Sequence, residues 1–305
     1  MEPPLHEVQP GDVVLMRSAH PTAELIRALD YDAEVDFAAL ALGHGLLGEV
    51  VGVGSRRHPL AAAVAHHAAT VVLRPVRAGD AAPVLRQATR VLDSGARLVQ
   101  HQLALLGVLT LTRPLAPTPS RRPLVQGVLS AATTALHAAL HHGYRLLLPE
   151  FVPTVFRDAH APLHLNRSEN GLPGTLIAKL ADTVLPAARP RPATTDEPGP
   201  AYKQAVAGIQ PVVRRYLAEL AGDVAADTPP PSGGIDQEDA LLQAVADFAA
   251  ALAPATGQPT HPHDPRLALQ AVTTVVRDPH FLTPGDLLRN PALTERLRLA
   301  QPVHS

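Results

Sequence analysis

Short apolar runs separated by turns that contain glycine or proline dominate the first 76 residues of the chain. Four runs rich in Val, Leu and Ala each predict a strand, over residues 12–18, 37–43, 46–54 and 69–76. Helical spacing predicts short helices over about 21–29 and 60–67, and a third that starts near Asp80 and continues to about Leu92. Because the strands cluster early, we expect an α+β fold with a small antiparallel sheet packed with helices.

The pattern changes to longer helical runs after residue 97. Two runs rich in leucine and alanine, joined by the proline-rich "TRPLAPTPSRRP", predict a helical hairpin inserted over residues 97–142. A helix introduced by Leu148 and Pro149 comes next, and further helices are predicted over about 201–222, 237–252 and 265–277. We therefore expect a first domain over residues 1–183, a proline-rich linker over 184–200, and a mostly helical C-terminal region with proline-rich loops over 201–305.

Composition excludes several classes of function. The 305 residues include 26 Lys and Arg against 28 Asp and Glu, a net charge of −2, which provides no basic field for nucleic acid. The chain has no cysteine, so thiol catalysis, disulfides and thiolate metal sites are excluded. The N-terminal segment lacks the basic and apolar regions of a signal peptide, and no run reaches about 18 apolar residues. We expect a cytoplasmic protein without nucleic-acid partners.

Short motifs occur in an order that resembles one enzyme family. The stretches "QPGDVVLMRS", "VDFAALALGHGLLGEVVGVG", "ATVVLRPV" and "LLLPEFVPTVFRDA" follow one another within residues 10–160, and "HFLTPGDLLRNPAL" stands near the end. This order resembles the circularly permuted papain-like family of the YiiX and YebB type, relatives of the NlpC peptidases and amidases. The resemblance implies a catalytic histidine on an early strand and a cysteine nucleophile at the start of a late helix.

Hydrocarbon side chains occupy both of those catalytic positions. The resemblance places Leu148 at the nucleophile, with Pro149 and Glu150 after it, Phe37 at the histidine, and Glu49 at a glutamate on the following strand. Leucine cannot ionise and phenylalanine cannot accept a proton, so the thiolate–imidazolium chemistry is lost. We expect Leu148 and Phe37 to meet in an apolar core. The resemblance thus implies a catalytically inactive homologue that binds, scaffolds or regulates an unknown protein or small-molecule ligand.

Two other kinds of chemistry stay open. An active hydrolase or amidase would need a relocated nucleophile, such as Ser18, Ser55, Ser130 or Ser168, and a base such as His44; none of the serines lies in a Gly-x-Ser-x-Gly context. His137 and His141 stand four apart on a predicted helix and are candidate metal ligands, and "THPHDP" offers His261, His263 and Asp264. No spacing specifies a complete ligand set, so we expect neither a metal nor a cofactor.

The helical hairpin over residues 97–142 raises a further alternative. It is strongly apolar, and its loop carries Arg113, Arg121 and Arg122, a combination suited to weak contact with a membrane surface or to holding an acyl chain. An apolar helix must also bury its face when it packs within a protein. We favour packing, since only an exposed apolar patch would indicate a partner.

Overall fold

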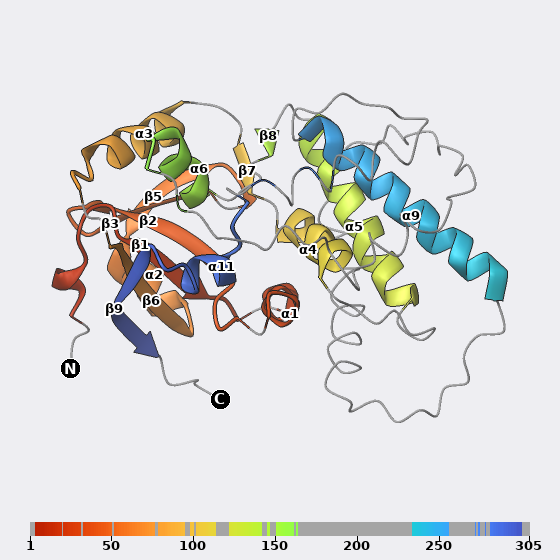
Figure 1. The fold of residues 1–305 in the computed structure, drawn as a ribbon, viewed down its shortest axis with the longest axis horizontal. Coiled ribbons are helices and arrows are strands. Elements are labelled where there is room, and N and C mark those ends of the chain that lie inside the picture. Colours follow the sequence, from red (N-terminus) through yellow and green to blue (C-terminus); the bar gives the residue numbers. More distant parts are fainter. Residues whose placement is uncertain are drawn as a thin grey trace. The chain divides into compact units, whose positions relative to one another are not determined.

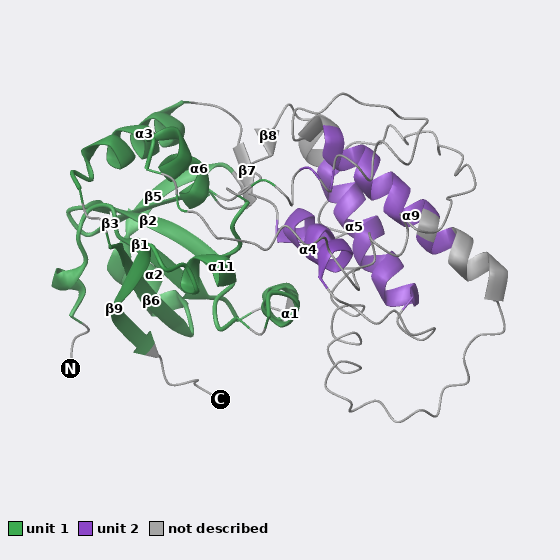
Figure 2. Cartoon of the chain, viewed as in Figure 1, with its two compact units in different colours: residues 1–100, 144–167, 278–305 green, residues 101–143, 168–277 purple. Residues whose placement is uncertain are grey.

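The structure, a computed structural model, describes part of the chain as two compact units. The described residues are 4–19, 21–31, 33–50, 52–76, 79–94, 98–100, 102–113, 122–141, 145–146, 151–161, 163, 234–255, 272, 274, 278 and 281–300. Unit 1 comprises Met1–Gln100, Tyr144–Arg167 and Asp278–Ser305, and unit 2 comprises His101–Gly143 and Ser168–Arg277 (Figure 2). This division differs from the expected one, because the end of the chain belongs with its beginning rather than with a C-terminal helical region.

Unit 1 is built on a six-stranded antiparallel sheet in the order β5-β3-β2-β1-β6-β9 (Figure 1). Its strands are β1 (Val13–Arg17), β2 (Phe37–Gly43), β3 (Leu46–Val50), β5 (Ser55–Pro59), β6 (Ala69–Pro75) and β9 (Leu293–Ala300). Three shorter strands, β4 (Gly52–Val53), β7 (Leu98–Gln100) and β8 (Arg145–Leu146), form a second sheet. Helices pack on the main sheet, so the expected α+β fold class is confirmed.

Alternation along the strands sends side chains into two separate apolar clusters, one on each face of the sheet. On the first face, which we call the α6 face, strand residues such as Leu15 and Leu40 pack with α3 (Ala82–Asp93), α6 (Phe151–Asp158) and Leu287. On the second, the α2 face, their neighbours Met16 and Ala39 pack with α2 (Leu60–His66). Unit 1 also contains α1 (Pro21–Leu29) and α11 (Pro284–Leu288), whose Leu287 belongs to the cluster of the α6 face, and a 3-10 helix, η1 (Leu5–Glu7), precedes β1.

The polar strand β5 was not predicted from the sequence. The apolar run over residues 46–54 indicated one strand, whereas β3 ends at Val50 and the chain turns through Gly54, at a φ of +122°, into β5. As an edge strand, β5 has a free side and shows no apolar alternation. Its arginines pair with carboxylates instead: Arg56 with Glu49 and Arg57 with Asp93.

The last strand, β9, returns to the sheet formed by the first 76 residues. It pairs with β6 in an antiparallel register that sets Thr70 opposite Leu299 and Val72 opposite Leu297. A bulge between Val72 and Leu73 leaves Arg296 without a partner in the register. Sequence patterns did not predict this strand, because its only pairing partner lies more than 200 residues earlier in the chain.

A buried carboxylate fastens this C-terminal segment to the N-terminal part of unit 1. Asp30, at the end of α1, is fully buried and accepts hydrogen bonds from the hydroxyl of Thr283 at 2.8 Å and the backbone N–H of Gly285 at 2.8 Å. Thr283 also caps α11, since its side chain and that of Asp286 form a capping box. The Arg289 guanidinium lies 3.6 Å from the Asp30 carboxylate and stacks on the ring of Tyr31.

Unit 2, considered by itself, contains α4 (Gln102–Thr112), α5 (Arg122–His141) and α9 (Gly234–Ala255). All α4 residues from Leu103 to Thr112 are buried, and α5 and α9 pack around this helix. At Gly107 the approach is so close that a Cβ atom would lie 2.5 Å from the Phe248 ring. Protein therefore covers the most apolar part of the predicted hairpin. Within the described ranges, no helix combines the length and apolar character that a membrane span needs.

Replacing Asp30 with Ala should lower the free energy of unfolding of unit 1 by about 2–4 kcal/mol, because the buried Thr283 hydroxyl and Gly285 N–H lose their acceptor. Urea unfolding followed by far-UV circular dichroism measures the change. The control is Asp80→Ala, which removes an exposed carboxylate that accepts a hydrogen bond from Ala82. Equal effects of the two substitutions would contradict a stabilising role for Asp30.

Replacing Gly285 with Ala should destabilise the same junction by about 1–3 kcal/mol through overpacking. An added Cβ would lie 2.5 Å from the Asp30 carboxylate and 2.8 Å from the Ala33 Cβ. Gly79→Ala is the matched control, since a Cβ there meets nothing within 4 Å. Urea unfolding again measures the change in the free energy of unfolding. If the Gly285 variant is as stable as the Gly79 variant, the junction accommodates the added Cβ and the prediction is wrong.

Candidate functional site

Helix α6 follows the predicted nucleophile position. It lies on the opposite face of the main sheet from Phe37, which occupies the predicted histidine position. Phe151 and Val155 of α6 pack on the α6 face, whereas Phe37, 5% exposed, packs on the α2 face. Leu148, Pro149 and Glu150 themselves lie outside the described residues. A contact between Leu148 and Phe37 therefore stays a prediction.

Phe37 and Glu49, in contrast, lie on the same face of neighbouring strands. The pairing of Leu40 with Gly48 places Glu49 beside Ala39, two residues along β2 from Phe37. Glu49 is 1% exposed, and its carboxylate accepts a hydrogen bond from Nε of Arg56 on β5. A buried carboxylate needs such a partner, since an isolated charge is costly to remove from water.

His58 is a second partner of Glu49 that sequence reasoning missed. Its Nε2 lies 3.1 Å from Oε1 of Glu49, although the ring is not aligned for a hydrogen bond. The run "SRRH" reads as a solvated basic cluster, and only the tight β3–β5 turn brings Glu49 opposite Arg56 and diagonal to His58. A carboxylate beside an imidazole is the arrangement that orients a general base.

The described serines do not supply a nucleophile for this pair. Ser55 pairs with Val50, and its hydroxyl donates to the Leu92 carbonyl at 3.1 Å, on the α6 face away from His58. Ser18 follows β1 at the end of the sheet where α1 begins, and Ser130 lies on α5 of unit 2. Ser168 is outside the described residues. Among the candidate serines that the structure describes in unit 1, neither Ser18 nor Ser55 lies beside the Glu49–His58 pair.

Two other buried ion pairs fix the chain rather than forming a reactive centre. Asp36 accepts hydrogen bonds from Nη1 of Arg27 at 2.8 Å and from the Ser18 N–H at 2.8 Å, which ties α1 to the start of β2. Asp12 receives two hydrogen bonds from Arg74, at 2.8 and 2.7 Å, and this pairing raises the pKa of the arginine further. Arg74 also donates to the Glu7 carbonyl and so holds η1 against the sheet.

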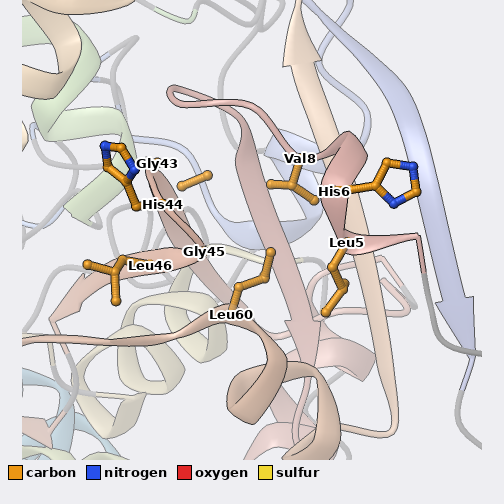
Figure 3. A pocket seen from close by; sticks show the side chains of 9 residues that line it. Leu5, His6, Val8, Gly43, His44, Gly45, Leu46 and Leu60 are labelled. Carbon is orange, nitrogen blue, oxygen red and sulfur yellow. The ribbon is translucent and has the colours of Figure 1, made fainter.

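A pocket of ≈ 410 Å³ opens on the α2 face, between the N-terminal segment and α2 (Figure 3). Its lining consists of Leu5, His6, Val8, Ala41, Gly43, His44, Gly45, Leu46 and Leu60. His44 occupies the β2–β3 turn with a φ of +52°, between two glycines that also have positive φ. His6 and His44 stand on opposite sides of the pocket in Figure 3, and their rings point away from each other. They are not arranged to hold one metal ion.

The predicted metal ligands do not form a cluster in the described part of the chain. No group of three or more His, Asp or Glu side chains that suits a metal ion occurs among the residues searched there. His137 lies on α5, while the side chain of His141 and the residues His261, His263 and Asp264 lie outside the description. Although His137 is exposed, partial desolvation lowers its pKa, and the negative charge of Asp247 on α9 opposes that effect.

Comparison with family models, with curated proteins and with solved structures gives no match. The described residues of unit 1 provide a buried Glu49 paired with Arg56 and close to His58, a phenylalanine at the predicted histidine position, and a pocket on the same face.

Replacing Asp247 with Asn should lower the pKa of His137 further below its ordinary value of 6.5, because it removes a negative charge that favours the imidazolium. A pH titration of the His137 ring signals by NMR measures the shift. Asp80→Asn, an exposed carboxylate of unit 1, should leave the titration unchanged. A His137 pKa that rises in the Asp247 variant would contradict the assignment.

Proposed function

We propose that this protein is a catalytically inactive relative of the permuted papain-like hydrolases and acts as a binding protein. The observation that carries the proposal is the side chain at the histidine position: Phe37 is 5% exposed and packed in an apolar cluster of the sheet. Together with the absence of cysteine from the whole chain, this leaves neither a thiolate nor the imidazole that would activate it.

The polar residue that the resemblance retains, Glu49, supports the same proposal. In an active site a buried carboxylate has to orient a base or stabilise a developing charge. Here Glu49 is paired with Arg56, which is more than half exposed, and lies beside His58 on the edge strand. This arrangement neutralises a buried charge and holds β5 to β3, a structural use of the residue.

The pocket on the α2 face is the site at which we place binding. Its ≈ 410 Å³ falls within the roughly 300–1,000 Å³ of small-molecule sites. Leu5 and Val8 form one wall, and the hydrogen bond from Arg74 to Glu7 holds that wall in place. Leu46, also in the lining, is 37% exposed. A small, predominantly apolar molecule suits this lining.

The catalytic half of the proposal is tested with chromogenic peptide, amide and ester substrates. We expect turnover of the wild-type protein to equal the rate in buffer alone. The alternative is an active hydrolase in which His58, close to Glu49, serves as the general base. Turnover that disappears in both His58→Gln and Glu49→Gln, but persists in His66→Gln, would establish that alternative; His66 is a matched control because it is an exposed histidine at the end of α2.

The binding half is tested by two-dimensional NMR of the full-length protein with a set of small apolar fragments. We expect weak binders to shift the amide signals of Ala41, His44 and Gly45, and to lose this effect in Val8→Trp, whose indole would fill the pocket. Shifts that persist in Val8→Trp, or that map away from the β2–β3 turn, would remove this pocket from the proposal.

A further inference from the structure

The C-terminal arm, which we define as residues 281–300, consists of two parts with very different burial. Its first part, residues 281–290 and here called the anchor, is almost entirely buried in unit 1. Its second part, β9, has no buried residue from Leu293 to Leu299. Opening free energies follow burial and contact density, so the two parts have different local stabilities.

Specific interactions hold the anchor in place. Leu282 and Leu287 are 1% and 0% exposed and belong to the apolar cluster of the α6 face. Asp30 accepts hydrogen bonds from Thr283 and Gly285, and the close approach at Gly285 leaves no room for a side chain. Releasing the anchor would expose apolar core and leave buried polar groups without partners.

β9 is held mainly by its backbone pairing with β6, which runs from Ala69 opposite Ala300 to Pro75 opposite Leu293. It is an edge strand, paired on one side with β6 through a register that Arg296 interrupts. Leu297 and Leu299 are partly buried and pack against the cluster of the α2 face, while the partly buried Leu293 packs against that of the α6 face. Among the described residues, an ion pair of Arg298 with Glu34 joins this end of the arm to the rest of unit 1, and both side chains are 42% exposed. Exposed ion pairs of this kind contribute little.

We propose that the arm is a two-part closing device, in which β9 detaches from β6 while the anchor stays bound at Asp30. Unit 1 then exchanges between a closed, six-stranded sheet and an open sheet of five strands. In the open state the backbone N–H and C=O groups of β6 that face β9 lose their strand partners. Asp30 keeps the detached strand tethered, so that closure does not require the arm to find its site again.

Amide hydrogen exchange of the full-length protein, resolved by NMR, tests this proposal. We expect the amides of β9 to exchange at least about ten-fold faster than those of the anchor, represented by Gly285, Leu287 and Arg289, and than those shared by β1 and β2. Arg298→Gln should speed exchange in β9 by about two- to five-fold and leave the anchor unchanged. Arg296→Gln is the matched control, because it alters an arginine of the same strand that has no place in the register.

Two results would overturn the proposal. If Arg298→Gln accelerates the anchor amides by the same factor as those of β9, the arm opens as one unit. If the β9 amides exchange as slowly as those between β1 and β2, the sheet has no separate open state. Asp30→Asn provides a second variant that weakens the anchor directly; under the proposal it speeds exchange in both parts of the arm, and acceleration of β9 alone would contradict the tether.

Discussion

The capture of the C-terminal arm by the Asp30 carboxylate is the constraint on which unit 1 depends. Asp30 lies at the end of the first helix, and its hydrogen-bonding partners, Thr283 and Gly285, lie more than 250 residues later. A buried carboxylate without donors would be strongly unfavourable, so the N-terminal part needs the arm as much as the arm needs Asp30. The sheet can reach six strands only when the end of the chain has returned.

Local patterns predicted the elements whose apolar alternation is recorded in the sequence. The strands that became β1, β2 and β6, and the helices α1, α2 and α3, were all predicted close to their observed bounds, because each buries an apolar face. Patterns failed at both edges of the sheet. The edge strand β5 pairs its arginines with Glu49 and Asp93, and β9 has a partner that no local window contains. Edge strands lack the buried faces that make a strand recognisable.

Some features of the candidate site can be predicted from the sequence, whereas others depend on how the strands pair. The absence of cysteine and the phenylalanine at position 37 are readable without any coordinates, and they carry the proposal of lost chemistry. The neighbourhood of Glu49 is not readable, because the turn at Gly54 determines which β5 residues stand beside it. His58 was therefore missed, although it is the residue that an active-hydrolase alternative would need most.

Both edges of the sheet carry features that resist pairing with another copy of the protein. Two copies of β9 could pair as antiparallel strands related by a two-fold axis, an arrangement that places residues of the same face opposite each other. With that axis near the middle of the strand, Glu295, Arg296 or Arg298 would then stand opposite a side chain of the same charge. The bulge at Arg296 and the charged side chains of β5 act in the same direction. The side of β6 that pairs with β9 lacks such features, because β9 covers it. An arm that opens would thus uncover the one edge of this sheet on which a strand can pair without repulsion, and the tether at Asp30 would return β9 to that edge first.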